Sequence, residues 1–80
     1  MKLREYFEQR KDEKIAYEVY DSSEKIKIME GNPKLFLALL GDYFLDRVII
    51  VEYYVISIKD ENLCKRIIID CEVVSDDIMG

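Results

Sequence analysis

Hydrophobic residues are densest between Arg47 and Lys59, in the stretch RVIIVEYYVISIK. Read with the two-residue repeat of a β-strand, this stretch is mainly apolar on both faces. A strand that is apolar on both sides is typical of a central position with a neighbour at each edge. The pattern therefore predicts a long central strand. Glu52 interrupts the apolar pattern. Three positions remain open for it: a sheet end, a bulge, or a face exposed to solvent or to a partner.

A β-hairpin is predicted upstream of this strand. Apolar and polar residues alternate from Lys14 to Tyr20 and again from Lys25, with Asp21, two serines and Glu24 between the two runs. Asp and Ser form local hydrogen bonds to the backbone that favour a turn, so two alternating runs around them indicate a hairpin. The alternative, in which the first run continues an N-terminal helix, stays open.

An amphipathic helix is predicted at the N-terminus, from Met1 to about Lys11. Leu3, Tyr6 and Phe7 fall on one helical face, and mainly charged residues surround them. Isolated helices of this length are marginal in water. The apolar face is therefore expected to dock on the rest of the chain.

A second helix is predicted to begin at Asn32 and Pro33. Asn is a preferred N-cap, and Pro fits the first helical position because its missing N–H has no partner there. Residues expected to face the core recur three and four apart, at Phe36, Leu39, Leu40, Tyr43 and Phe44. Gly41 either weakens this helix or ends it, so its end is open between Leu40 and Asp46.

The last strand is predicted from about Cys64 to Val74, after a turn at residues 60–62. One face carries Ile67, Ile69, Cys71 and Val73, and the other carries Arg66, Ile68, Asp70 and Glu72. Together these elements predict an α+β fold of order αββαββ, with an antiparallel sheet and helices packed on one face. Because the chain has 80 residues, we expect a single domain over residues 1–80.

Charge is distributed unevenly along the chain. The net charge is −5, with eight basic and eight acidic residues before position 41 but four basic and nine acidic residues after it. Such a chain releases no counterions from DNA or RNA, so direct nucleic-acid binding is not expected. An acidic surface does attract a basic one on another protein.

Most catalytic chemistry lacks its usual residues. The sequence has no histidine, tryptophan or threonine, and its three glycines are isolated. The commonest general base and a glycine-rich phosphate loop are therefore missing. Carboxylates occur in pairs without the spacing of a calcium loop, at Asp42 and Asp46, Asp60 and Glu61, and Asp76 and Asp77. We expect no enzyme activity, no cofactor and no metal.

Two further features bear on location. Cys64 and Cys71 are too far apart along one strand to bridge, and two thiols without histidine do not make a zinc site, so we expect reduced thiols. The N-terminus is charged where a signal peptide needs an apolar run, and the longest apolar stretch is shorter than a membrane span. These observations predict a soluble cytoplasmic protein without membrane contact.

Exposed tyrosines and acidic residues are the candidate partner-binding groups. Tyr53 and Tyr54 point to opposite faces of the long strand, so one of them is expected on the surface, where tyrosine is typical of binding sites. The alternative is that tyrosine rings cap the core while their hydroxyls reach water. Carboxylates predicted to gather on one side of the last hairpin complete the candidate site: Asp60, Glu61, Asp70 and Glu72.

The chain resembles short, uncharacterised accessory proteins of phages and prophages of low-GC Gram-positive bacteria. The resemblance lies in the opening MKLREYFE, with Leu3, Tyr6 and Phe7, and in VISI at Val55 to Ile58. It implies an accessory protein of a mobile element that binds and blocks a host protein, CRISPR effectors included.

Two functions follow as predictions. The first is a non-enzymatic protein-binding module, with inhibition of a host defence or nucleic-acid-handling protein as its role and a basic surface as its target. The alternative is a structural homo-oligomer, a dimer for example, in which a face or edge of the sheet is completed by a second copy.

Overall fold

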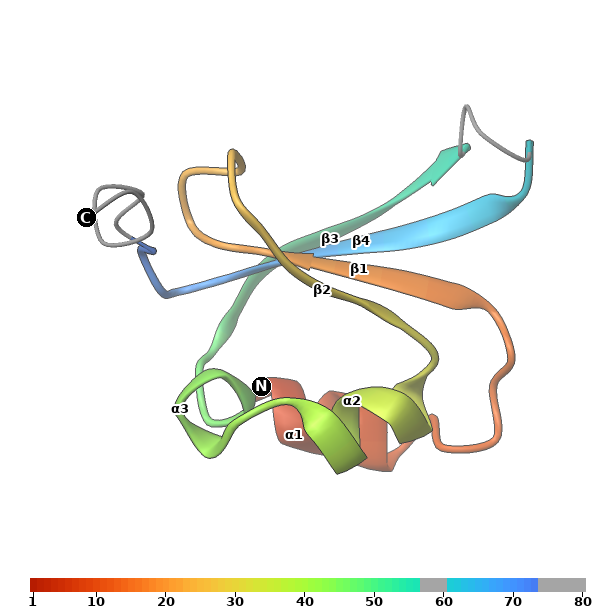
Figure 1. Ribbon diagram of the computed structural model, residues 1–80, viewed down its shortest axis with the longest axis horizontal. Helices are drawn as coiled ribbons and strands as arrows, with labels where there is room; N and C mark the ends of the chain where they lie inside the picture. Colours follow the sequence, from red (N-terminus) through yellow and green to blue (C-terminus); the bar gives the residue numbers. More distant parts are fainter. Residues whose placement is uncertain (57–60, 74–80) are drawn as a thin grey trace.

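Two β-hairpins lie side by side in the computed structural model, which describes residues 1–56 and 61–73. The described elements, in chain order, are α1 (Leu3–Glu8), β1 (Ala16–Tyr20), β2 (Lys27–Gly31), α2 (Pro33–Leu39), α3 (Asp42–Leu45), β3 (Ile49–Ile56) and β4 (Leu63–Ile69). Among these residues the strands form one sheet of order β2-β1-β4-β3. Figure 1 shows the three helices on one side of that sheet. The α+β class and the one-sided helical layer are as predicted.

The sheet is mixed, so the prediction of an antiparallel sheet is wrong. Each hairpin is antiparallel within itself, but β1 pairs with β4 in parallel, from Ala16 opposite Cys64 to Tyr20 opposite Ile68. Alternation of side chains sets which face a residue occupies and is the same in parallel and antiparallel strands. The direction of a pairing between distant segments is therefore not encoded in that pattern.

The long apolar strand is β3, and it lies at an edge of the sheet instead of at its centre. The central strands are β1 and β4, and β4 carries three consecutive buried residues, Ile67, Ile68 and Ile69. The stretch with the longest apolar run is thus less buried than the shorter strand beside it. This corrects the predicted central position of residues 47–59, of which 57–59 lie outside the described residues.

Glu52 lies close to a bulge, and its side chain is 37% exposed. The register of β3 against β4 shifts between Ile49 and Val51, so one extra residue is accommodated on β3 just before Glu52. Its carboxylate accepts from the Lys65 amine at 2.8 Å and from the Tyr6 hydroxyl at 3.4 Å. These contacts with α1 and β4 place Glu52 on the side of the sheet that the helices cover.

Helix α1 buries the predicted face, with Leu3, Tyr6 and Phe7 all inaccessible or nearly so. The segment after it forms β1, so the alternative of a continued helix is wrong. Ser22, Ser23 and Glu24 lie in the turn between β1 and β2, and Glu24 has a positive φ of 63°. That turn also contains Asp21, which is fully buried and is discussed below.

The second predicted helix divides into α2 and α3. Asn32 caps α2 as expected, since its side chain accepts from the Leu35 N–H at 2.9 Å and Pro33 follows it. Leu40 then adopts an extended conformation, with ψ at 135°, and Gly41 becomes the N-cap of α3. The element order is therefore αββααββ, because the helix stops before Gly41 and restarts after it.

This break redirects two of the predicted core residues. Phe36 is fully buried, and Leu40 and Phe44 are partly buried against the core. Leu39 and Tyr43 are 68% and 58% exposed, so their predicted core positions are wrong. A continuous helix would have kept all five residues on one stripe, whereas the change of direction at Leu40 turns these two outward.

β4 ends at Ile69, earlier than the predicted Val74. Its two faces are less distinct than expected, because Ile68 on the second face is also buried. Cys64 and Cys71, at the two ends of this strand, are buried free thiols. Residues 74–80, which include the predicted end of the strand, lie outside the described part of the chain.

Candidate functional site: the outer edge of β3

The described sheet has two edge strands, β2 and β3, and β3 is the longer, with eight residues against five. Hydrogen bonds near its start show which backbone groups point outward. The Asp70 N–H donates to the Val48 carbonyl over 2.8 Å, so Asp70 directs its backbone toward β3. Backbone direction alternates along a strand, so Arg66 and Cys64 also direct their N–H and C=O groups toward β3.

These directions show which residues of β3 direct their backbone N–H and C=O groups toward β4. Tyr53 pairs with Arg66 and Val55 with Cys64, so Tyr53 and Val55 exchange hydrogen bonds with β4. The intervening residues must point away from β4. The outward N–H and C=O groups of the edge therefore belong to Glu52, Tyr54 and Ile56.

The N-terminal residues cover only the beginning of this edge. Lys2 forms an antiparallel bridge with Val48, and the Ile49 N–H donates to the Met1 carbonyl over 3.0 Å. The Leu3 N–H likewise donates to the Arg47 carbonyl over 2.9 Å. Within residues 1–56 and 61–73, no strand pairs with the outer edge of β3 after this bridge.

Apolar side chains are exposed along the same edge. The exposed fractions are 56% for Ile50, 43% for Val51, 57% for Tyr54 and 69% for Ile56. Exposed apolar side chains and unpaired backbone groups on one long edge strand favour pairing with another strand. We call these four side chains, with the outward backbone groups of Glu52, Tyr54 and Ile56, the β3 edge.

A polar cluster supports the β3 edge from the helical side. Burial acts to lower the pKa of Lys65, but hydrogen bonds and charge interactions with Glu52 and Tyr6 together outweigh burial and raise the pKa above the ordinary value. The amine also lies 5.3 Å from the ring centroid of Tyr6 and 5.1 Å from that of Tyr54. Lys65 therefore stays charged, and its amine makes a cation–π contact with the Tyr54 ring.

The other face of the sheet carries a second set of polar contacts. Arg66 donates to the Glu18 carboxylate from Nε and Nη2, over 3.1 and 2.9 Å, and its guanidinium lies 4.5 Å from the Tyr20 ring centroid. The Tyr53 hydroxyl donates to Glu24 over 3.3 Å. None of the three described helices covers this face (Figure 1). Its charged groups are already paired with one another, so it offers a partner fewer unsatisfied groups than the β3 edge does.

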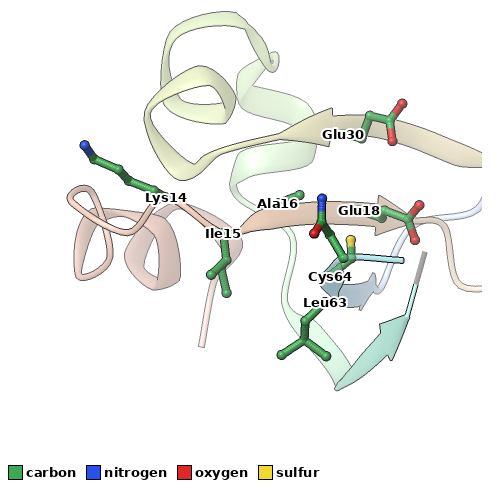
Figure 2. Close-up of a pocket in the computed structure, with 8 residues that line it drawn as sticks. Lys14, Ile15, Ala16, Glu18, Glu30, Leu63 and Cys64 are labelled. Atoms are coloured by element: carbon green, nitrogen blue, oxygen red, sulfur yellow. The ribbon is translucent and has the colours of Figure 1, made fainter. Parts of the chain in front are cut away.

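A hollow of about 390 Å³ lies where β1 and β4 begin. Glu18, Glu30 and Cys64 line it, and Figure 2 shows the Lys14 amine pointing away from both carboxylates. Burial, and then the nearby Glu18 charge, raise the pKa of the Cys64 thiol, so the unreactive protonated form is favoured. The Glu18 carboxylate is held by Arg66. The described lining thus assembles no activated nucleophile.

The described members of the predicted partner-binding set occupy four separate places. Tyr54 is exposed on the β3 edge, while Tyr53 is half-buried on the opposite side of the same strand. Glu61 precedes β4, whereas Asp70 and Glu72 follow its far end, and seven strand residues span about 23 Å. Asp60 lies outside the described residues. The described carboxylates are exposed but do not form the single acidic side that the sequence suggested.

Sequence reasoning missed the three aliphatic members of the β3 edge, which are Ile50, Val51 and Ile56. They belong to a strand that the sequence predicts as central, with a neighbour at each edge. Charge content gives no signal for them, since β4 contains Lys65 and Arg66 whereas β3 contains Glu52 alone.

The paired carboxylates give no metal site in the described part of the chain. Asp42 and Asp46 both bind the Arg4 guanidinium, at 2.7 and 3.1 Å, and Asp76 and Asp77 lie outside the described residues. Residues 1–56 and 61–73 contain no group of three or more His, Cys, Asp or Glu side chains that could hold a metal ion. Over the same residues, no helix is long and apolar enough to cross a membrane.

Comparison of the chain with protein-family models, with curated proteins and with solved structures finds no match. The resemblance to phage and prophage proteins therefore stays a prediction. The functional argument rests on the geometry of the β3 edge.

Proposed function

We propose that this chain is a non-enzymatic protein-binding module that accepts an added strand at the β3 edge. One observation carries the proposal, namely that β3 is an eight-residue edge strand whose outward backbone groups face no described strand after the bridge at Val48. Strand addition supplies a partner with main-chain hydrogen bonds, and side chains on alternate positions provide specificity.

The exposed side chains of the β3 edge support the same function. Fully burying an isoleucine, valine or aromatic side chain stabilises a contact by about 1.5 to 3 kcal/mol. The side chains of Ile50, Val51, Tyr54 and Ile56 are 43% to 69% exposed, so each can still gain part of that free energy by contact with a partner. Lys65 holds the Tyr54 ring, so less side-chain freedom is lost on binding.

A basic partner surface remains part of the proposal because the net charge is −5. Since Glu61 and Asp70 lie at opposite ends of β4, this charge acts as a general attraction that speeds association and weakens with salt. The role as an inhibitor of a host defence or nucleic-acid-handling protein, in the cytoplasm, stays a prediction that rests on the sequence.

The proposal predicts that Tyr54→Pro abolishes partner capture without unfolding the chain. Proline is tolerated on an edge strand where the missing N–H faces solvent, and the Tyr54 N–H points outward. Val55→Pro is the contrasting variant, because the Val55 N–H faces β4 and its loss costs about 1 to 3 kcal/mol. Thermal unfolding should show a nearly unchanged midpoint for Tyr54→Pro and a clearly lower one for Val55→Pro.

Capture is measured with the immobilised chain in bacterial lysate containing a differently tagged copy of the same chain, at low and high salt. Bound proteins are identified by mass spectrometry. Tyr54→Ala, which keeps the N–H, should retain part of the capture, whereas folded Tyr54→Pro should retain none. The proposal is wrong if Tyr54→Pro captures the same proteins as the parent chain, or if the parent captures nothing specific.

A further inference from the structure

We infer that residues 70–73 form a clasp, held closed by the Asp21 carboxylate, which opens while the rest of the chain stays folded. Opening exposes the Cys71 thiol, which is buried in the closed clasp. This conformational device does not depend on the proposed function. Support comes from the attachment of the clasp, from the hydrogen bonds of Asp21, and from the different surroundings of Cys64 and Cys71.

Hydrogen bonds at single positions attach the clasp to its neighbours. The strand β4 ends at Ile69, and the Cys71 N–H then turns back to the Ile69 carbonyl over 2.9 Å, where the blue trace bends (Figure 1). The Asp70 N–H donates to the Val48 carbonyl over 2.8 Å. The Cys71 carbonyl accepts from the Ser22 N–H over 2.7 Å. A short segment outside the paired strands opens at a lower free energy than the core of a sheet.

The Asp21 carboxylate joins the clasp to the turn between β1 and β2, and each of its oxygens holds a different segment. Oδ2 accepts from the Val73 N–H over 3.2 Å, which closes the clasp. Oδ1 accepts from the Ser23 hydroxyl over 2.7 Å and from the Ile26 N–H over 3.3 Å, which orders the turn. Asp21 is fully buried, so both oxygens depend on these donors in place of water.

Asp21→Asn should weaken the closed clasp and keep the turn. The amide has nearly the shape of the carboxylate, but it supplies one acceptor oxygen, and its NH2 group can only donate. The oxygen is expected at the Oδ1 position, where two donors converge, so the NH2 group meets the Val73 N–H. Two donors that face each other form no hydrogen bond, and the closed clasp loses its attachment to Asp21.

The two thiols distinguish clasp opening from global unfolding. Cys64 and Cys71 are equally inaccessible, with 6% exposure each. Cys64 lies inside β4, with Ala16 of β1 on one side and Val55 of β3 on the other, so its exposure requires separation of the sheet. Cys71 belongs to the clasp, which opens without that separation. Two equally buried thiols are therefore exposed by different opening reactions.

Alkylation of the full chain by iodoacetamide at increasing urea, below the unfolding transition, tests the clasp. Mass spectrometry gives a rate for each thiol, and division by the rate of the same thiol in the unfolded chain removes differences in intrinsic reactivity. A local opening exposes little surface, so the Cys71 rate should change little with urea. The Cys64 rate should rise with the steep slope of global unfolding. Without urea, Cys71 should react faster than Cys64.

Phe36→Leu and Asp21→Asn should affect the two rates differently. Phe36 is fully buried in α2, outside the clasp and β4, so its change favours global unfolding and leaves clasp opening unaffected. Phe36→Leu should therefore raise the Cys64 rate severalfold and leave the Cys71 rate near that of the parent. Asp21→Asn should raise both rates about tenfold or more, because clasp opening and global unfolding both break the bond at Val73.

Each contrary outcome overturns a stated part of the inference. If both thiols share one urea slope, or if Phe36→Leu raises both rates by the same factor, Cys71 is exposed only by global unfolding and there is no clasp. If Asp21→Asn leaves the Cys71 rate unchanged, Asp21 does not hold the clasp closed. Strand addition at the β3 edge is tested separately by partner capture with Tyr54→Pro.

Discussion

Phe7→Ala is expected to lower the free energy of unfolding by about 3 to 5 kcal/mol. The Phe7 ring is fully buried between the helices and the sheet. It stacks on Phe36 of α2, with centroids 4.6 Å apart, and meets the edge of Tyr17 of β1 at 5.3 Å. Truncation would leave a cavity where α1, α2 and β1 meet. A loss of this size equals the whole stability expected of a domain so small, so the variant should be largely unfolded.

Chemical denaturation followed by circular dichroism measures this effect. Leu39→Ala is the control, because its side chain is exposed and surface changes usually stay within about 0.5 kcal/mol. Similar losses in the two variants would show that α1 is not packed into the core by Phe7, which would contradict the fold. Such a result would also remove the support that α1 gives to Glu52 through Tyr6.

Asp21→Ala is expected to destabilise the chain by about 2 to 4 kcal/mol, because it leaves buried donors without an acceptor. The fully buried carboxylate accepts from the Ser23 hydroxyl at 2.7 Å and from the backbone N–H groups of Ile26 and Val73, at 3.3 and 3.2 Å. It therefore joins the turn after β1 to the segment that follows β4. Ser22→Ala, in the same turn but exposed, is the matched control.

The effect of Asp21 should depend on pH in a defined direction. Burial acts to raise the Asp21 pKa, but the hydrogen bonds from Ser23, Val73 and Ile26 outweigh burial and lower the pKa below its ordinary value. A depressed pKa in the folded state contributes stability above the unfolded pKa, and this contribution is lost as the pH falls through the folded value. The stability gap between the parent and Asp21→Ala should therefore be full at pH 7 and shrink below about pH 4. A gap that is unchanged at pH 3 would show that the charge of Asp21 is not what stabilises this corner.

Local features of this fold could be predicted because they depend on nearby residues. The buried face of α1 follows from the spacing of Leu3, Tyr6 and Phe7, and the start of α2 follows from Asn32 and Pro33. These signals act over three or four residues, which a sequence displays directly. The two hairpins were also predicted, since each joins strands that are adjacent in sequence.

Long-range features could not be predicted in the same way. The parallel contact of β1 with β4 joins segments about 48 residues apart, and nothing in their alternation specifies its direction. The edge position of β3 follows from that contact, because pairing of β1 with β4 leaves β3 outermost. The sequence places Asp21 in a turn but does not show its burial, since one of the N–H groups that donate to its carboxylate belongs to Val73, which is distant in sequence and close in space.

The candidate site changed for the same reason. The sequence predicts that one of Tyr53 and Tyr54 lies on the surface, and Tyr54 is the exposed one. The aliphatic residues beside it are exposed because their strand, predicted as central, lies at the edge. The proposed acidic side depended on the turn before β4 and the segment after it being close together, and the length of β4 keeps them apart. The proposed function depends on the unpaired backbone of an edge strand. No residue type in the sequence predicts which strand has that position.

Hydrogen exchange at individual backbone amides, measured by NMR at low and high chain concentration, tests the β3 edge most directly. The account predicts that Tyr53 and Val55 are protected at both concentrations, because their amides bond to β4. The amides of Glu52, Tyr54 and Ile56 should exchange rapidly in the dilute chain and become protected as the chain associates. The account is contradicted if those three amides are already protected in the dilute monomer. It is also contradicted if they still exchange rapidly once the chain has associated or has bound another protein.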